Sequence, residues 1–199
     1  TRSTNDATII LEPTLVENNN PAVSPTSLDP FEMVKAGEFD KFVNVVESGT
    51  FFPANEIDRN GATALHWAAG AGSVLFVTYL VETCQCNPNE KQQAKRAFRG
   101  RTPLHWAARN GHLEVVKYLI AVGVDIDATT QDGTTAFCWA AWQGHLDVMR
   151  FLSASAADIH AENSFGCNAV LWTAQGDASI ETLEWLRSAG LDFYTVNSN

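Results

Sequence analysis

The sequence has few basic residues, and this shortage excludes one class of function. Among its 199 residues, 13 are Lys or Arg and 23 are Asp or Glu, which gives a formal net charge of -10 and a pI near 4.8. A protein that depends on phosphate contacts needs basic residues over much of its surface. We therefore expect no nucleic acid as the main partner.

Cysteines are also few. The four are too irregularly spaced for the disulfide framework of a secreted protein, and the close pair Cys84 and Cys86 has no second pair to complete a zinc site. We interpret all four as reduced intracellular thiols, and we predict no metal and no cofactor. The full set is Cys84, Cys86, Cys138 and Cys167.

The patterns that usually carry catalysis are missing. The sequence contains no Gly-rich phosphate loop, no paired-carboxylate site and no metal-ligand spacing, and nothing in it places a base near Cys138. We predict that this chain is not an enzyme and has no small-molecule substrate. An activity beyond Asn199 stays open, because the fifth repeat described below ends either as a degenerate cap or with the chain continuing, and we favour continuation.

Signals for targeting or membrane insertion are absent as well. No basic and apolar signal peptide opens the chain. Ala62–Val81 lacks Asp, Glu, Lys and Arg over a membrane-spanning length, but Gly70 and Gly72 interrupt it, so we expect no transmembrane segment. We predict an intracellular protein, cytoplasmic or nuclear by default. A plastid or mitochondrial location and association with a membrane protein complex remain open.

The sequence does contain an internal repeat. Segments that begin at Gly61, Gly100, Gly133 and Gly166 align, at steps of 39, 33 and 33 residues. A second column of aromatic–Leu pairs repeats at nearly the same steps. The longer first step indicates a six-residue insertion near residues 90–97. The aligned segments read GATALHWAAGAG, GRTPLHWAARNG, GTTAFCWAAWQG and GCNAVLWTAQGD.

One repeat carries a clear family resemblance. Residues 102–128, TPLHWAARNGHLEVVKYLIAVGVDIDA, resemble an ankyrin repeat nearly letter for letter, and the resemblance covers residues 29–199. It implies an all-α repeat fold, an ankyrin-type solenoid of stacked helix-turn-helix units with projecting β-hairpin loops. An extended, low-complexity N-terminal arm, residues 1–28, precedes it. The approximate repeats are 29–57, 58–96, 97–129, 130–162 and 163–199.

Local signals agree with two helices per repeat. Thr102 caps a helix that Pro103 starts, Gly111 breaks the chain, and Gly123 ends the second helix in a left-handed conformation. Ala156 stands in the column of Gly123 in the fourth repeat, where a Cβ costs about 1 kcal/mol, so this repeat is expected to be weaker. Cys84 occupies the same column in the second repeat.

Two histidines follow Leu in the repeated Thr-x-Leu-His element. The resemblance implies that His66 and His105 form hydrogen bonds within and between repeats. We prefer this structural role to a catalytic or metal-binding one.

The tryptophans predict both packing and binding. One first-helix column holds Trp67, Trp106, Trp139 and Trp172, which we interpret as intramolecular packing between stacked units. Trp142 stands directly after the Ala-Ala pair, in the column that holds Arg109 in the third repeat. The resemblance places this column on the concave groove. Two interpretations stay open: Trp142 is a binding hot spot, or it folds flat onto its neighbours.

The insertion forms a basic segment on an acidic protein. The residues that we expect to contact a partner, in the insertion and outside it, are basic residues and aromatic residues. The basic insertion residues are Lys91, Lys95 and Arg96, and the predicted partner-binding residues are Phe98, Arg99, Arg101, Arg109, Trp142 and Phe165.

Two functions follow as hypotheses. The first is a non-enzymatic module or adaptor that binds a protein partner with an acidic patch through loop tips and the concave helix surface. The second is a structural accessory subunit of a large, organellar or other multiprotein complex, anchored by the arm at residues 1–28. Its Ser-, Thr-, Asn- and Pro-rich composition predicts disorder when nothing holds it.

Overall fold

The computed structural model describes residues 29–93, 99–176 and 179–191. The predicted N-terminal arm and the insertion residues Lys95, Arg96 and Phe98 therefore lie outside the described residues. Within those ranges the chain forms ten α-helices and one π-helical turn, with no strand. The predicted all-α repeat fold is confirmed.

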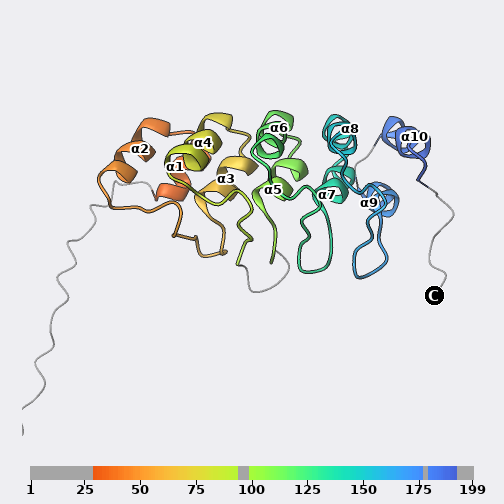
Figure 1. Ribbon diagram of the computed structural model, residues 1–199, viewed down its shortest axis with the longest axis horizontal. Helices are drawn as coiled ribbons and strands as arrows, with labels where there is room; N and C mark the ends of the chain where they lie inside the picture. The colour runs from red at the N-terminus through yellow and green to blue at the C-terminus, as the bar shows by residue number, and fades with distance from the viewer. Residues whose placement is uncertain (1–28, 94–98, 177–178, 192–199) are drawn as a thin grey trace, which may run out of the picture.

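The helices form two parallel rows, and each repeat contributes one helix to each row (Figure 1). The inner row lies next to the projecting loops, and the outer row lies on the far side of it. The inner helices are α1 (Pro30–Ala36), α3 (Ala64–Gly70), α5 (Pro103–Arg109), α7 (Ala136–Trp142) and α9 (Ala169–Gln175). The outer helices are α2 (Phe39–Glu47), α4 (Val74–Thr78) with the π-helical turn η1 (Tyr79–Thr83), α6 (Leu113–Ala121), α8 (Leu146–Ala154) and α10 (Ile180–Ser188).

Capping side chains start the inner helices. The hydroxyl of Thr63 accepts the backbone N–H of His66, Thr135 accepts that of Cys138, and the Asn168 side chain accepts two backbone N–H groups of α9. Each bond satisfies a donor that the first turn of a helix leaves without a partner. Polar residues at one repeated position thus set where α3, α7 and α9 begin.

Small residues let the inner helices approach one another. The alanine pairs of α3, α5 and α7 are fully buried, and the core is one continuous apolar cluster that runs from Phe31 to Leu191. No single layer can bury its apolar face alone, so stability comes from contacts between neighbours. The Ala62–Val81 stretch belongs to this core as two short elements that separate at the left-handed Gly72.

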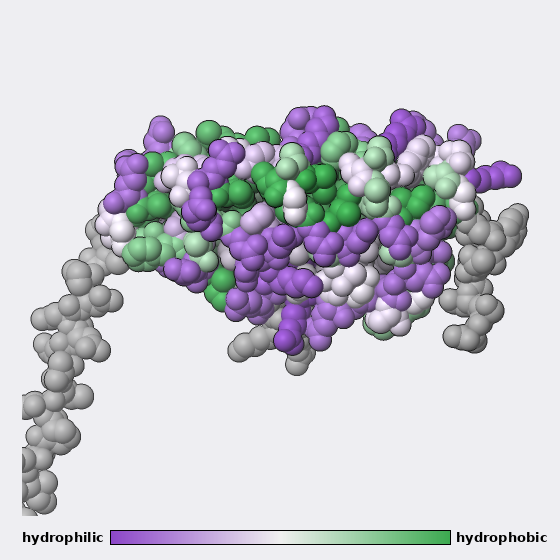
Figure 2. Space-filling model, in the orientation of Figure 1, coloured by the Kyte–Doolittle hydropathy of each residue, from purple (hydrophilic) through white to green (hydrophobic). Residues whose placement is uncertain are grey.

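The projecting loops fold back without becoming strands. Thr130 N–H donates to the Thr134 carbonyl (3.0 Å), and the only ladder contact in the described residues is an isolated bridge between Thr129 and Thr135. The predicted β-hairpins are therefore hairpin-like loops. Neighbouring loops are joined by bonds such as Gln131 N–H to the Arg99 carbonyl (3.1 Å). Figure 2 shows their polar side chains below an apolar band.

The second repeat differs from the prediction at its helix end. The left-handed residue is Gln85 (φ 55°), whereas Cys84 has φ -84°. The π-helical turn at Tyr79–Thr83 accommodates one extra residue, which moves the end of the helix by one position. One residue of the six-residue insertion therefore lies in this helix.

Candidate protein-binding surface

The tryptophan column lies on the inner helices but is not continuous. The rings of Trp67 and Trp106 meet edge to face at 4.9 Å between centroids, and Trp139 meets Trp172 at 5.8 Å. Among the described residues, Trp106 and Trp139 make no such ring contact. The interpretation of this column as packing therefore holds for two neighbouring pairs. The middle step of the column, between Trp106 and Trp139, has no ring contact.

A hollow of about 370 Å³ occupies this middle step. Three indoles and two arginines surround it, so its walls are largely apolar and its charge is positive. We call it the Trp–Arg pocket. Its lining residues are Asn60, Trp67, Gln92, Arg101, His105, Trp106, Arg109, Asn110 and Trp139.

The two arginines lie against indole rings. The guanidinium carbon of Arg101 is 4.1 Å from the Trp139 ring centroid, and that of Arg109 is 5.6 Å from the Trp142 centroid. A guanidinium can stack on an aromatic face and still present N–H groups at its edge. These contacts hold the arginine heads against the indole rings.

Histidines from the neighbouring repeats hold the backbone of both arginines. His66 Nε2 donates to the Arg101 carbonyl (2.9 Å), and His145 Nε2 lies 3.0 Å from the Arg109 carbonyl. The tautomer of His66 follows from its other nitrogen, because Nδ1 accepts the backbone N–H of Thr63 (3.2 Å). His105 accepts from Thr102 N–H and donates to the Thr134 carbonyl (3.1 Å) in the same way.

Burial keeps these two histidines neutral. His66 and His105 are almost completely buried, and this burial lowers the pKa of each imidazole from 6.5 to about 4. The hydrogen bonds to backbone carbonyls oppose the shift but are the smaller effect. Both side chains connect adjacent repeats and are enclosed by them.

Several buried polar atoms of this surface have no partner among the described residues. They are Trp106 Nε1, Trp139 Nε1, Arg109 Nε and Gln92 Oε1 within the pocket, and Trp172 Nε1 beyond it. Gln92 is only 3% exposed, and its Nε2 donates to the Asn60 carbonyl (3.0 Å). That bond fixes the amide orientation, because only the nitrogen can donate to a carbonyl.

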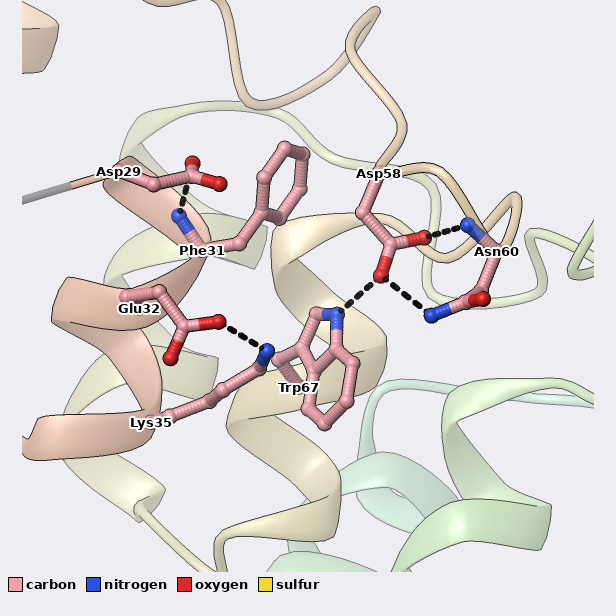
Figure 3. A network of polar contacts seen from close by, with 7 residues as sticks. All are labelled: Asp29, Phe31, Glu32, Lys35, Asp58, Asn60 and Trp67. Carbon is pink, nitrogen blue, oxygen red and sulfur yellow. Dashed lines mark hydrogen bonds and ion pairs between the residues drawn. The ribbon is translucent and has the colours of Figure 1, made fainter.

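At the N-terminal end of the surface, the polar groups around Trp67 form hydrogen bonds and ion pairs within the chain. Trp67 Nε1 donates to Asp58 Oδ2 (3.1 Å), and Lys35 Nζ lies 3.8 Å from the Trp67 ring centroid while it pairs with Glu32 (2.6 Å) (Figure 3). Asp58 also accepts from Asn60 (Figure 3). The indole N–H of Trp67 thus has a partner, unlike the indole N–H groups of Trp106 and Trp139.

Trp142 shows features of both interpretations. It is half-buried, its ring meets Trp139 at 5.4 Å and Trp172 at 6.1 Å, and Arg109 lies against it. It is therefore supported by its neighbours and still partly open to solvent. Its role in binding stays a prediction.

The other predicted contact residues lie away from the pocket. Arg99 and Lys91 are exposed loop residues, and Lys91 Nζ donates to the Thr129 carbonyl (3.3 Å). Phe165 is 74% exposed on a loop of the fifth repeat. Of the predicted partner-contacting residues in the described ranges, the structure brings Arg101, Arg109 and Trp142 together.

Sequence reasoning missed Gln92 and the open step between Trp106 and Trp139. Gln92 belongs to the insertion and has no repeated column to identify it. The sequence did mark His112 and His145 as a repeated structural position, since both follow Gly in one column. Their Nε2 atoms lie 2.9 and 3.0 Å from the carbonyls of Gly70 and Arg109 in the preceding repeats.

The thiols of Cys86 and Cys138 are buried and held protonated. All four cysteines are free, and burial raises the pKa of Cys86 to about 12 and also raises the pKa of Cys138. Cys138 lies in the core, where its Sγ is 3.9 Å from the Ala161 carbonyl. Thiols held protonated in this way are poor nucleophiles and poor metal ligands.

Stacked two-helix layers with an aromatic inner surface define a solenoid protein built for contact with other macromolecules. The family of ankyrin repeats in three copies matches residues 35–130 and 83–163 of this chain. These overlapping matches cover well over half of the sequence. The chain belongs to the ankyrin repeat family, whose members are typically non-enzymatic interaction modules.

A shorter similarity relates the chain to a characterised protein. It is 34% identical over 61 residues to the 26S proteasome non-ATPase regulatory subunit 10 of Dictyostelium discoideum. The match covers 31% of this chain and 26% of the relative, so the chain spans about a quarter of that protein's length. Separately, none of the helices in the described ranges is long and apolar enough to cross a membrane.

Proposed function

We propose that this chain is a non-enzymatic interaction module that binds a protein partner with an acidic patch. The contact surface consists of the inner helices α3, α5, α7 and α9 together with the loop tips. Arg101, Arg109 and Trp142 lie at its centre, and Arg99 and Phe165 extend it along the loops. We place the protein inside the cell, in the cytoplasm or nucleus by default.

One observation carries this proposal: tryptophans and arginines lie together on one surface, with buried donors that no described residue satisfies. Trp and Arg are the residues most enriched among binding hot spots. Indole contacts restrict the arginine heads before a partner arrives, which reduces the entropy that binding must offset. An acidic partner would find positive charge here on a protein of net charge -10.

Site-specific photocrosslinking tests this proposal. Benzoylphenylalanine at position 142 is expected to form adducts with a partner protein in cells. The same probe at Lys117, which is exposed on the outer helix α6, is expected to form few or none. Equal adduct yields at both positions, or adducts at position 117 alone, would show that the partner contacts another face.

A structural subunit of a large complex is the second candidate. The similarity to a protein named as a proteasome regulatory subunit favours it, since that name describes a member of an assembly. Limited proteolysis of the isolated chain and of the native particle separates the two candidates. Cleavage within residues 1–28 in isolation, with protection in the particle, supports anchoring by the arm. The same cleavage in both samples contradicts it.

A further inference from the structure

The Trp–Arg pocket interrupts the column of tryptophan rings on the inner helices. Within the described ranges, the ring contacts of Trp106 come from the second repeat, with His66 at 5.9 Å and Trp67 at 4.9 Å between centroids. Trp139 contacts Trp172 of the fifth repeat instead, at 5.8 Å. Trp106 and Trp139 both line the hollow of about 370 Å³, which therefore lies at the step of the column where two rings do not meet.

The two sides of the hollow differ in their chemistry. Trp67 and Trp106 are partly exposed, so indole surface forms one side. On the other side, Trp139 is only 8% exposed, and the guanidinium carbon of Arg101 lies 4.1 Å from its ring centroid. Arg109 also lines the hollow, with its guanidinium carbon 6.0 Å from the Trp139 centroid. An occupant therefore meets indole rings on one side and guanidinium groups on the other.

These walls favour an aromatic ring over other side chains of similar size. An aromatic ring packs against indoles in edge-to-face or offset arrangements, and its π face attracts a guanidinium group. A saturated side chain has no π face, so it gains only the apolar contact. An ammonium group also binds indole faces, but the charge of Arg109 repels it, and within the described ranges no Asp or Glu forms an ion pair with Arg109.

The charge around the hollow is complementary to an acidic segment. Among the described residues, those that line it include two arginines and no Asp or Glu. Two exposed basic residues adjoin the lining in the sequence, since Lys91 precedes Gln92 and Arg99 lies two residues before Arg101. Carboxylates that flank an inserted ring therefore meet positive charge at the mouth of the hollow.

We propose that the Trp–Arg pocket receives an aromatic side chain from an acidic segment of the partner protein. The proposal rests on the proposed function and specifies what that surface selects. The ring lies between the indoles of Trp67 and Trp106 and the guanidinium of Arg109, where it completes the tryptophan column. The acidic residues on either side of the ring face Lys91 and Arg99.

Capped tripeptides provide the test. N-acetyl-Asp-Phe-Glu-amide is titrated into the full chain while the indole N–H signals, assigned from Trp→Phe variants, are followed by NMR. We expect saturable shifts at Trp67 and Trp106, because the ring current of the bound Phe acts on both, and none at Trp185 of the outer helix α10.

The matched peptide carries cyclohexylalanine in place of Phe. Its saturated ring has nearly the same size and is more apolar, so simple apolar burial favours it. We nevertheless expect it to bind about fivefold more weakly, because it offers no π face to Arg109. Equal or tighter binding of the cyclohexylalanine peptide overturns the proposal, as does tighter binding of a peptide with Lys in place of Phe. Shifts at Trp185 as large as those at Trp106 also overturn it.

A charge-matched pair of variants provides the control. Arg109→Gln is expected to reduce the preference for Phe over cyclohexylalanine to about twofold or less. Arg150→Gln, which removes an exposed outer-row charge paired with Glu181, is expected to leave this preference unchanged. A folded Arg109→Gln variant that keeps the full preference overturns the proposal. If that variant does not fold, the comparison of the two peptides on the natural chain decides alone.

A neutral peptide tests the acidic part of the proposal. N-acetyl-Asn-Phe-Gln-amide is expected to bind about threefold more weakly than the acidic peptide at low salt, and the difference should shrink as salt is added. Equal binding of the two peptides at low salt overturns the assignment of an acidic segment.

The two proposals fail separately. If the chain does not distinguish Phe from cyclohexylalanine while the probe at position 142 still forms adducts with a partner, the pocket assignment is wrong and the interaction module stands. If the probe at position 142 forms no adducts either, the proposed function falls with it.

Discussion

At the scale of single residues, two buried histidines join neighbouring repeats, and one of them holds the backbone of Arg101. The His66 imidazole connects α3 to the Arg101 carbonyl, and His105 connects α5 to the Thr134 carbonyl. Both roles need a neutral ring with one donor and one acceptor nitrogen. Acid would remove the acceptor that each ring offers to its capping threonine.

Stability is therefore expected to fall as the pH is lowered from about 6.5 to 4. The pKa of each histidine is about 4 in the folded chain and near 6.5 unfolded, so the unfolded chain binds more protons in this window. Each histidine should cost about 2 kcal/mol of unfolding free energy between pH 7.5 and 5. Urea denaturation at the two pH values measures this loss.

The His66→Asn and His105→Asn variants separate this effect from the titration of carboxylates. Each variant should be less stable than the natural chain at pH 7.5 and should lose less stability on acidification. An unchanged pH dependence in both variants would show that other groups are responsible.

The left-handed Ala156 gives a second prediction at this scale. Its φ is 67°, a conformation that costs a residue with a Cβ about 1 kcal/mol. Ala156→Gly should therefore raise the unfolding free energy by about that amount, as measured by urea denaturation.

Gly123→Ala is the matched control for Ala156→Gly. Gly123 has φ 83°, and a Cβ there would meet nothing within 4 Å, so only the backbone conformation changes. It should lower stability by about 1 kcal/mol. A destabilised Ala156→Gly variant would contradict this view of the fourth repeat.

At the scale of the helices, different contacts join different pairs of neighbouring repeats. Histidine bonds connect the second, third and fourth repeats, whereas Cys138 stands in that position of the fourth repeat. There the close approach of α7 and α9 brings Gly176 against the end of α7. A Cβ on Gly176 would lie 1.7 Å from the Trp142 carbonyl oxygen.

Gly176→Ala is therefore expected to weaken the packing of the fifth repeat against the fourth. The collision involves backbone, so it cannot be relieved by a side-chain rotation, and we expect a loss of about 3 kcal/mol. Hydrogen exchange should rise in α9 and α10 while α3 and α5 stay protected.

Gly190→Ala supplies the comparison for Gly176→Ala. A Cβ on Gly190 would meet nothing within 4 Å, so this change tests the left-handed backbone alone. It should cost less than Gly176→Ala. Equal exchange in the two variants would mean that the contact between α7 and α9 is not tight.

Helix positions could be predicted from the sequence because local chemistry sets them. Thr102 and Pro103 start a helix and Gly123 follows one, whatever the rest of the fold does. The shift from Cys84 to Gln85 could not be predicted in this way. It depends on how one extra residue is accommodated within a packed helix, as the π-helical turn at Tyr79–Thr83 shows.

The candidate site was predictable only in part, for a similar reason. Arg101, Arg109 and Trp142 stood out by residue type and column. The Trp column predicted regular packing, but Trp106 and Trp139 are separated at a step where Arg101 lies against Trp139. Gln92 comes from an insertion that repeats nowhere else, so only the folded chain shows its place.

At the scale of the whole molecule, the stack places one positive hollow on an acidic body. Long-range repulsion from a net charge of -10 opposes an acidic partner, whereas Arg101 and Arg109 attract it at short range. Under the proposed function, selectivity for a partner depends on contact at the inner surface rather than on overall charge. We therefore expect the inner surface, rather than the outer helices, to carry partner binding.

Quantitative co-purification with two charge-matched variants tests this most directly. The groove variant carries Arg101→Gln, Arg109→Gln and Trp142→Ala, and the outer variant carries Lys117→Gln and Arg150→Gln, so each loses two positive charges. Circular dichroism first establishes that both are folded. We predict that proteins retained by the natural chain are depleted at least tenfold with the groove variant and kept with the outer variant. A folded groove variant that retains the same proteins would contradict the assignment of the concave surface.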